Sequence, residues 1–147
     1  MNRRNNYIDF YTATILKKLG FDSITTLYFY AVEQDDDTLY ITESESCAKN
    51  WNNCVYSENN KEQYYSRPKY YEVLKWFREK YNIHTSIELR LAYNFRYIVR
   101  CYISIGSGKK IKLLGNNKDT YDFYEEAEAA AVNICLEYLK ITIKKEI

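Results

Sequence analysis

Hydrophobic residues recur at two different spacings along this chain, and the spacing changes at Asn82. Before Asn82 they follow the helical pattern i, i+3, i+4, i+7, in the order Tyr70, Val73, Leu74, Phe77 and Tyr81. After Asn82 they alternate with polar residues, which is typical of a strand that buries one face. The pattern predicts a helix over 68–81 followed directly by a strand over 83–91.

The same alternation recurs at 97–105 and, after Gly106 and Gly108, at 109–114. Together with 83–91, these runs predict three consecutive antiparallel strands. Their apolar positions share one face, which we expect to pack against helices. The other face is polar and basic.

The register of the first two strands decides which polar side chains meet. We predict that Leu89 lies opposite Val99, because this keeps both apolar sets on one side and a one-residue slip would bury charge. In this register Glu88 forms an exposed ion pair with Arg100, and His84 faces only a hydroxyl group.

Two more segments carry helical spacing. The first begins after Asp9, whose side chain can cap a helix, and it ends at Gly20, where a left-handed stop is favoured. The second is predicted over 122–140, where Asp122 and Glu125 resemble a capping box.

After the first of these helices, the runs 23–32 and 38–44 predict two strands of a hairpin around the turn "EQDDD". Residues 45–66 show no periodicity and predict a long loop. Trp51 and Tyr56 within it indicate either that the loop folds over the body or that it presents aromatic side chains to a partner.

The predicted fold class is α+β, with helices packed on antiparallel sheet in the order α-β-β-loop-α-β-β-β-α. A chain of 147 residues that is 46% hydrophobic and 28% charged has the size and composition of one globular domain. We therefore predict a single domain over 1–147. It has an acidic portion over 1–66, with six Lys and Arg against ten Asp and Glu, and a basic portion over 67–147, with fifteen against ten.

No apolar run reaches the roughly 20 residues that a membrane span needs, and the N-terminal segment lacks the apolar core of a signal peptide. We therefore expect a cytoplasmic protein with free thiols. One histidine and no C-x-x-C pair do not make up a zinc site, so no metal and no cofactor are expected.

The polar face of the predicted strands is the candidate binding site. Guanidinium groups beside aromatic rings suit a phosphate-bearing ligand or an acidic protein surface. The alternative is a solvated face with cross-strand ion pairs. The candidate residues are Arg90, Arg96, Arg100, Tyr93, Tyr102, Lys109, Lys110 and Lys112, with Trp51 in the loop as a further contact.

Catalysis is not expected. The stretch "HTS" at His84 resembles half of the paired signature of two-histidine phosphoesterases, but the chain has no second histidine. The stretch "GSGKK" lacks the strand-loop-helix setting and the spacing of a nucleotide-binding loop.

Residues 68–140, read as helix, three antiparallel strands and helix, resemble the topology of double-stranded-RNA-binding domains. That family uses lysines at the start of its last helix to contact phosphates. Here the corresponding segment, "DTYDFYEEAEAA", is acidic. The resemblance therefore implies a topology and does not favour RNA binding.

A second resemblance covers most of the chain and rests on "LKKLGFD", "SRPKYYEVLKWFREKYNI" and "TYDFYEEAEAA…LEYL". These stretches are similar to a group of small uncharacterised proteins of gut Bacteroidetes and their phages. The residues that carry the resemblance are Pro68, Trp76, Arg78, Glu79, Glu126 and Ala127. It implies a phage or mobile-element context.

The sequence thus predicts a non-catalytic binding protein that inhibits or sequesters a host component, either a host protein or a small phosphate-bearing ligand such as a nucleotide-like immune signal. The alternative is a nucleic-acid-associated regulatory module. No membrane partner is expected, and the sequence is compatible with a homo-oligomer.

Overall fold

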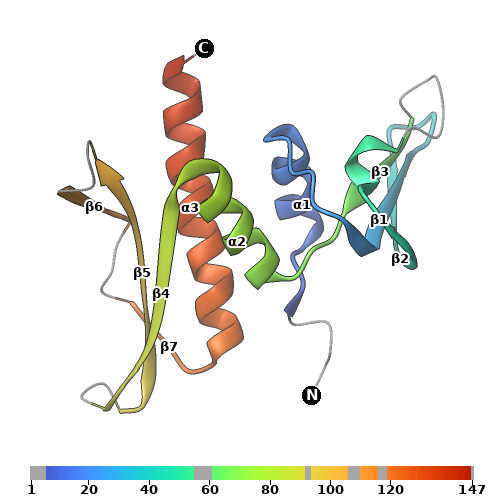
Figure 1. The fold of residues 1–147 in the computed structure, drawn as a ribbon. Helices are drawn as coiled ribbons and strands as arrows, with labels where there is room; N and C mark the ends of the chain where they lie inside the picture. The colour runs from blue at the N-terminus through green and yellow to red at the C-terminus, as the bar shows by residue number, and fades with distance from the viewer. Residues whose placement is uncertain (1–5, 55–60, 92–93, 106–109, 116–118, 147) are drawn as a thin grey trace. The chain divides into compact units, whose positions relative to one another are not determined.

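The computed structural model describes residues 6–54, 61–91, 94–105, 110–115 and 119–146. The chain forms two compact units, 1–69 and 70–147, and each has its own antiparallel sheet (Figure 1). The protein is therefore α+β, as predicted. The boundary between the units lies close to the predicted change from acidic to basic composition, and the single-domain arrangement stays a prediction.

The first unit contains α1 (Phe10–Lys18), β1 (Thr25–Glu33), β2 (Leu39–Lys49), the 3-10 turn η2 (Trp51–Asn53) and β3 (Glu62–Ser66). Its strands pair antiparallel in the order β2-β1-β3. The prediction of a loop over 45–66 is therefore wrong at both ends, because β2 extends through Lys49 and β3 covers Glu62–Ser66. The first half of β2 was predicted as a strand, but after Ser44 the strand is solvent-exposed on both faces and shows no hydrophobic alternation.

Helix α1 begins and ends as its sequence predicts. The Asp9 carboxylate accepts a hydrogen bond from the Thr12 N–H at 2.8 Å. At the other end Gly20 has a φ of 85°, and the N–H groups of Gly20 and Phe21 donate to carbonyls of the last turn. These two bonds make up a Schellman motif, which satisfies carbonyls that the helix leaves unpaired.

The Gly20→Ala substitution should lower the free energy of unfolding by about 1 to 2 kcal/mol, because an L side chain is disfavoured at this positive φ. Urea denaturation measures the change. Gly20→Asn is the matched control, since asparagine tolerates the left-handed region better than alanine. Equal stability of the alanine variant and the wild type would contradict the assignment.

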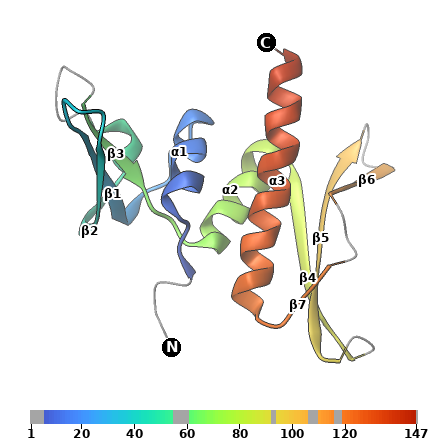
Figure 2. The same ribbon diagram turned by 180° about the vertical axis from the view of Figure 1, so that it is seen from behind.

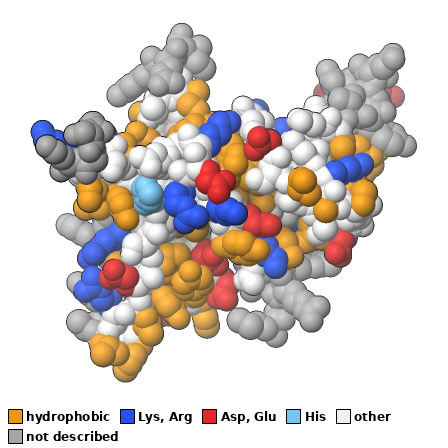
Figure 3. Space-filling model, in the orientation of Figure 1, with side chains coloured by type: hydrophobic (Ala, Val, Ile, Leu, Met, Phe, Trp, Pro, Cys, Tyr) orange, Lys and Arg blue, Asp and Glu red, His pale blue; other side chains and the backbone are white. Residues whose placement is uncertain are grey.

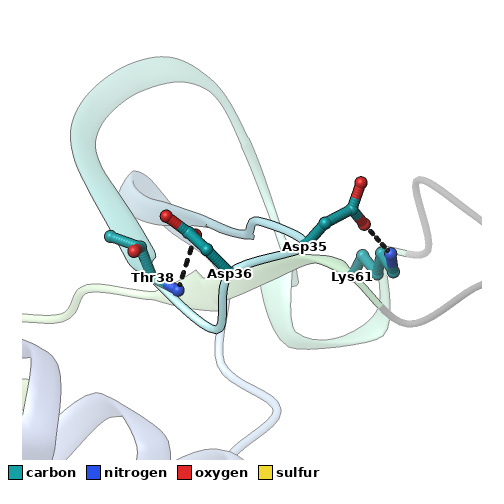
Figure 4. A network of polar contacts seen from close by, with 4 residues as sticks. All are labelled: Asp35, Asp36, Thr38 and Lys61. Atoms are coloured by element: carbon teal, nitrogen blue, oxygen red, sulfur yellow. Dashed lines mark hydrogen bonds and ion pairs between the residues drawn. The ribbon is translucent and has the colours of Figure 1, made fainter.

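Two aspartates of the turn between β1 and β2 form polar contacts (Figure 4). Asp36 accepts a hydrogen bond from the Thr38 N–H at 3.1 Å, and Asp35 lies 2.6 Å from the Lys61 ammonium group. Hydrogen bonding from Thr38 lowers the pKa of Asp36. These contacts stabilise a solvated hairpin turn.

The second unit contains α2 (Tyr70–Tyr81), β4 (Ile83–Arg90), β5 (Arg96–Ile105), β6 (Lys110–Leu114), β7 (Thr120–Tyr121) and α3 (Tyr124–Glu146). The strands pair antiparallel in the order β4-β5-β6, and β7 also pairs with β5. Both helices lie on the same face of this sheet (Figures 1 and 2). Helix α3 starts at Tyr124 and extends past the predicted end at Lys140. Its predicted cap, Asp122, forms an ion pair with Arg96.

The core of the second unit lies between the sheet and the two helices. Val73 and Phe77 of α2 and Ile83 of β4 are fully buried, as the alternating and helical patterns predict. From α3, the buried side chains are Ala127, Ala131, Val132, Cys135, Leu136 and Leu139. Small residues at the first two of these positions allow the helix to approach its neighbours closely.

The predicted register of the hairpin is wrong by two residues. Leu89 lies opposite Tyr97, and Glu88 lies opposite Ile98, so the predicted ion pair between Glu88 and Arg100 does not form. A two-residue shift keeps every side chain on its original face, so the hydrophobic pattern cannot distinguish the two registers.

Candidate functional site

The sheet face opposite α2 and α3, here called the outer face, brings together side chains from three strands. His84 of β4 lies opposite Tyr102 of β5, and Tyr102 lies opposite Leu113 of β6. The neighbouring cross-strand pair is Ser86 with Arg100. Because directly opposed residues point to the same side of a sheet, these side chains form one continuous surface.

An aromatic pair stands at the centre of this surface. The His84 and Tyr102 rings have centroids 5.4 Å apart and planes within 17° of parallel. The His84 Nε2–H donates to the Asn82 side-chain oxygen at 2.9 Å, which fixes the orientation of the ring. The histidine, the chain's only one, is visible at the surface in Figure 3.

Two of the predicted arginines are neutralised by neighbouring carboxylates. The Arg90 guanidinium lies 2.7 Å from Glu88, which belongs to the same strand. Arg96 lies 3.0 Å from Asp122 and also donates to the Thr120 hydroxyl at 3.2 Å. Both guanidinium groups already have anionic partners, so they are less able to bind a further anion.

Arg100 is in the opposite situation. Its side chain is exposed, and within the described parts of the chain no carboxylate forms an ion pair with it. The predicted register assigned Arg100 to an ion pair and left Arg90 and Arg96 unpaired, and the structure reverses these roles. The register shift explains the change at Arg100, since it moves Glu88 opposite Ile98. The partners of Arg90 and Arg96 come from within β4 and from the segment that leads into α3.

Two of the predicted lysines lie on the other side of the sheet. Lys112 is opposite Ile103, and its ammonium group lies 5.8 Å from the centroid of the Tyr138 ring on α3. Lys110 is opposite Ile105 and therefore shares the face of Lys112. Neither lysine belongs to the outer face with Arg100. The predicted site residues Tyr93 and Lys109 lie outside the described residues.

Trp51 is part of the core of the first unit and does not belong to a binding surface. Its side chain is only 4% exposed and stacks on Tyr28, with ring centroids 3.8 Å apart. Its indole N–H donates to the Thr25 carbonyl at 2.9 Å. The alternative in which this part of the chain folds over its own unit therefore holds for Trp51, while Tyr56 lies outside the described residues.

Three members of the outer face, His84, Ile111 and Leu113, are not among the predicted site residues. His84 was expected to face only a hydroxyl, but the true register places it beside Tyr102. The prediction assigned the lysines of 109–114 to the outer face. Leu113 and Ile111 lie there instead and are 55% and 65% exposed. Alternation within 109–114 separates the lysines from Ile111 and Leu113, but only the pairing with β5 shows which set faces the helices.

The buried cysteines Cys101 and Cys135 lie on β5 and α3. The Cys101 thiol lies 3.7 Å from the Ala131 carbonyl and the same distance from the Thr85 hydroxyl. The hydrogen bond with Cys101 and burial both raise the pKa of the Cys135 thiol. The Cys135 thiol therefore stays protonated and packs as a small hydrophobic group.

No cluster of metal-ligating side chains occurs in the described part of the chain. Its His, Cys, Asp and Glu side chains form no group of three or more that could hold a metal ion. Among the helices described, none is both long and apolar enough to cross a membrane. No protein-family model, no curated protein and no solved structure matches the chain.

Proposed function

We propose that the protein is a non-catalytic binding protein whose outer face takes a phosphate-bearing, nucleotide-like ligand. The observation that carries this proposal is the exposed, unpaired Arg100 beside the parallel rings of His84 and Tyr102. A guanidinium group can donate two parallel hydrogen bonds to a phosphate. The aromatic pair offers a surface on which a base can stack.

The surroundings of Arg100 support a ligand that is part polar and part apolar. Ser86 lies across from Arg100, and its hydroxyl, which donates to the Glu88 carboxylate at 3.4 Å, can still accept a hydrogen bond from a ligand. Exposed Leu113 continues the apolar surface on the other side of Tyr102. A phosphate on Arg100 and a base beside Tyr102 would use both halves of this surface.

The biological role that we propose is that of a phage or mobile-element accessory protein in the host cytoplasm. It would inhibit or sequester a host component, and a nucleotide-like immune signal is the small ligand that best fits Arg100 and Tyr102. This role rests on the resemblance of the chain to small proteins of gut Bacteroidetes and their phages. Sequestration needs affinity alone, so no catalytic group is required.

The Arg100→Ala variant should bind its nucleotide ligand about 10- to 100-fold more weakly, because a hydrogen bond to a charged group typically contributes ~1.5 to 3 kcal/mol. A panel of mono-, di- and cyclic nucleotides, screened by thermal stabilisation and then by titration calorimetry, identifies the ligand and measures the change. Tyr102→Ala should weaken binding as well, through loss of the stacking surface.

Lys112→Ala is the matched control, because it removes one positive charge from the opposite face of the same sheet and should leave affinity within about twofold. Two results would contradict the proposal. One is a wild-type protein that binds no member of the panel, and the other is an Arg100→Ala variant with unchanged affinity.

The nucleic-acid alternative makes a different prediction. Phosphate contacts give binding that weakens steeply with salt. Because Lys110 and Lys112 lie on the face away from Arg100, the outer face offers few cations for a duplex. We therefore expect no shift of duplex RNA or DNA in a gel at low salt, and a salt-dependent shift would favour the alternative.

A further inference from the structure

Each unit ends its sheet in an exposed edge strand. In the first unit this strand is β2, which among the described strands pairs only with β1 and is exposed along nearly its whole length. In the second unit it is β6, which pairs with β5 on one side and is exposed except at Leu114. An edge strand presents backbone N–H and C=O groups that can pair with another strand.

The two edges carry opposite charges. Glu43 and Glu45 of β2 point to one face, and Lys110 and Lys112 of β6 point to one face of their own sheet. Pairing of β2 with a second β2 would bring glutamates together, and pairing of β6 with a second β6 would bring lysines together. Like charges directly opposite one another destabilise a strand pair. Pairing of β2 with β2 or of β6 with β6 is therefore disfavoured.

We infer that β2 of one copy pairs antiparallel with β6 of a second copy of this chain. The register that opposes Glu45 to Lys110 also opposes Glu43 to Lys112, so one alignment satisfies both charge pairs. It makes the sheet of one unit continuous with the sheet of the other, as in binding by β-strand addition.

The same alignment covers exposed apolar side chains. Ile41, which is 44% exposed, would lie opposite Leu114, and Thr42 would lie opposite the exposed Leu113. In this alignment the charged pairs of both strands lie on the sheet face that packs against helices. Glu43 shares the face of Phe29, which packs against Phe10 of α1, while Lys112 faces Tyr138 of α3. The joined sheet therefore keeps its helices on one side and leaves the outer face with Arg100 accessible.

The pair to test is Glu45 with Lys110, because Glu43 already forms an ion pair with Arg67 at 3.1 Å. Glu45 and Lys110 are both exposed, so their replacement should not disturb either core. Size-exclusion chromatography with light scattering, over a range of concentrations, should show wild-type masses above the 17.7 kDa of one chain.

The charge-reversed variants Glu45→Lys and Lys110→Glu should each associate at least about tenfold more weakly, since each places like charges opposite one another. An equimolar mixture of the two variants should regain association. A single chain that carries both reversals should regain it as well. Circular dichroism confirms that each variant is folded.

The inference fails if the wild type is monomeric at every concentration or if either single variant associates as strongly as the wild type. It also fails if both variants lose association and neither the mixture nor the double reversal regains it. None of these results depends on nucleotide binding, which involves the other face of the sheet at Arg100.

Discussion

The Trp51→Ala substitution is expected to lower the free energy of unfolding of the first unit by about 3 to 5 kcal/mol, the range for removal of a large buried aromatic side chain. The substitution leaves a cavity beside Tyr28, and the Thr25 carbonyl loses its indole donor. Amide hydrogen exchange should show the loss of protection in β1 and β3, which form the sheet beneath Trp51.

Trp51→Phe is the matched control, because it retains most of the stacking area and removes only the N–H donor. Its cost should be about 1 to 3 kcal/mol, the penalty for leaving a buried acceptor unpaired. If Trp51→Ala were as stable as the wild type, Trp51 would not be a core residue. The same exchange data test the single-domain prediction, because one cooperative domain would lose protection in β4 and β5 as well.

The Gly115→Ala substitution is expected to lower the free energy of unfolding of the second unit by about 2 to 4 kcal/mol, from a strained backbone and an overpacked contact. Gly115 follows β6 with a φ of 70°, which disfavours any L side chain. An added Cβ would also lie 2.8 Å from Cγ2 of Ile134 on α3. Ile134 is β-branched and stiff within its helix, so it cannot rotate away cheaply.

A double-mutant cycle separates these two causes. In the Ile134→Ala background the steric contact is absent, so Gly115→Ala should cost only about 1 to 2 kcal/mol from the positive φ. Chemical denaturation of the four proteins gives the coupling between the two positions. Equal costs in both backgrounds would show that the Ile134 contact contributes nothing.

Features that depend on near neighbours in the chain could be predicted from the sequence. The cap at Asp9 and the stop at Gly20 are short-range hydrogen-bond and backbone preferences, and both are confirmed. The change of hydrophobic period at Asn82 correctly predicts α2 followed by β4, because burial on one face imposes a period of 3.6 or 2. The α+β class follows from these local patterns.

The site required tertiary information. When a strand register shifts by two residues, the same hydrophobic side chains still face the core. The alternation therefore could not predict that Glu88 lies opposite Ile98, which leaves Arg100 without an ion-pair partner. Likewise, the alternation in 109–114 is the same whether its lysines or its apolar residues face the helices. The pairing of β6 with β5 is what places Lys112 on the side of α3.

The first unit shows the same division between local and tertiary information. Trp51 lies in a stretch without periodicity, and its burial comes from contacts with Tyr28 and Thr25, which are distant in sequence. Periodic spacing along a single segment was enough to predict α2, β4 and β5 and the faces that they bury. The cross-strand neighbours of Arg100 and Lys112 and the contacts of Trp51 depend on the tertiary structure, because a contact between segments requires a pairing that neither segment encodes alone.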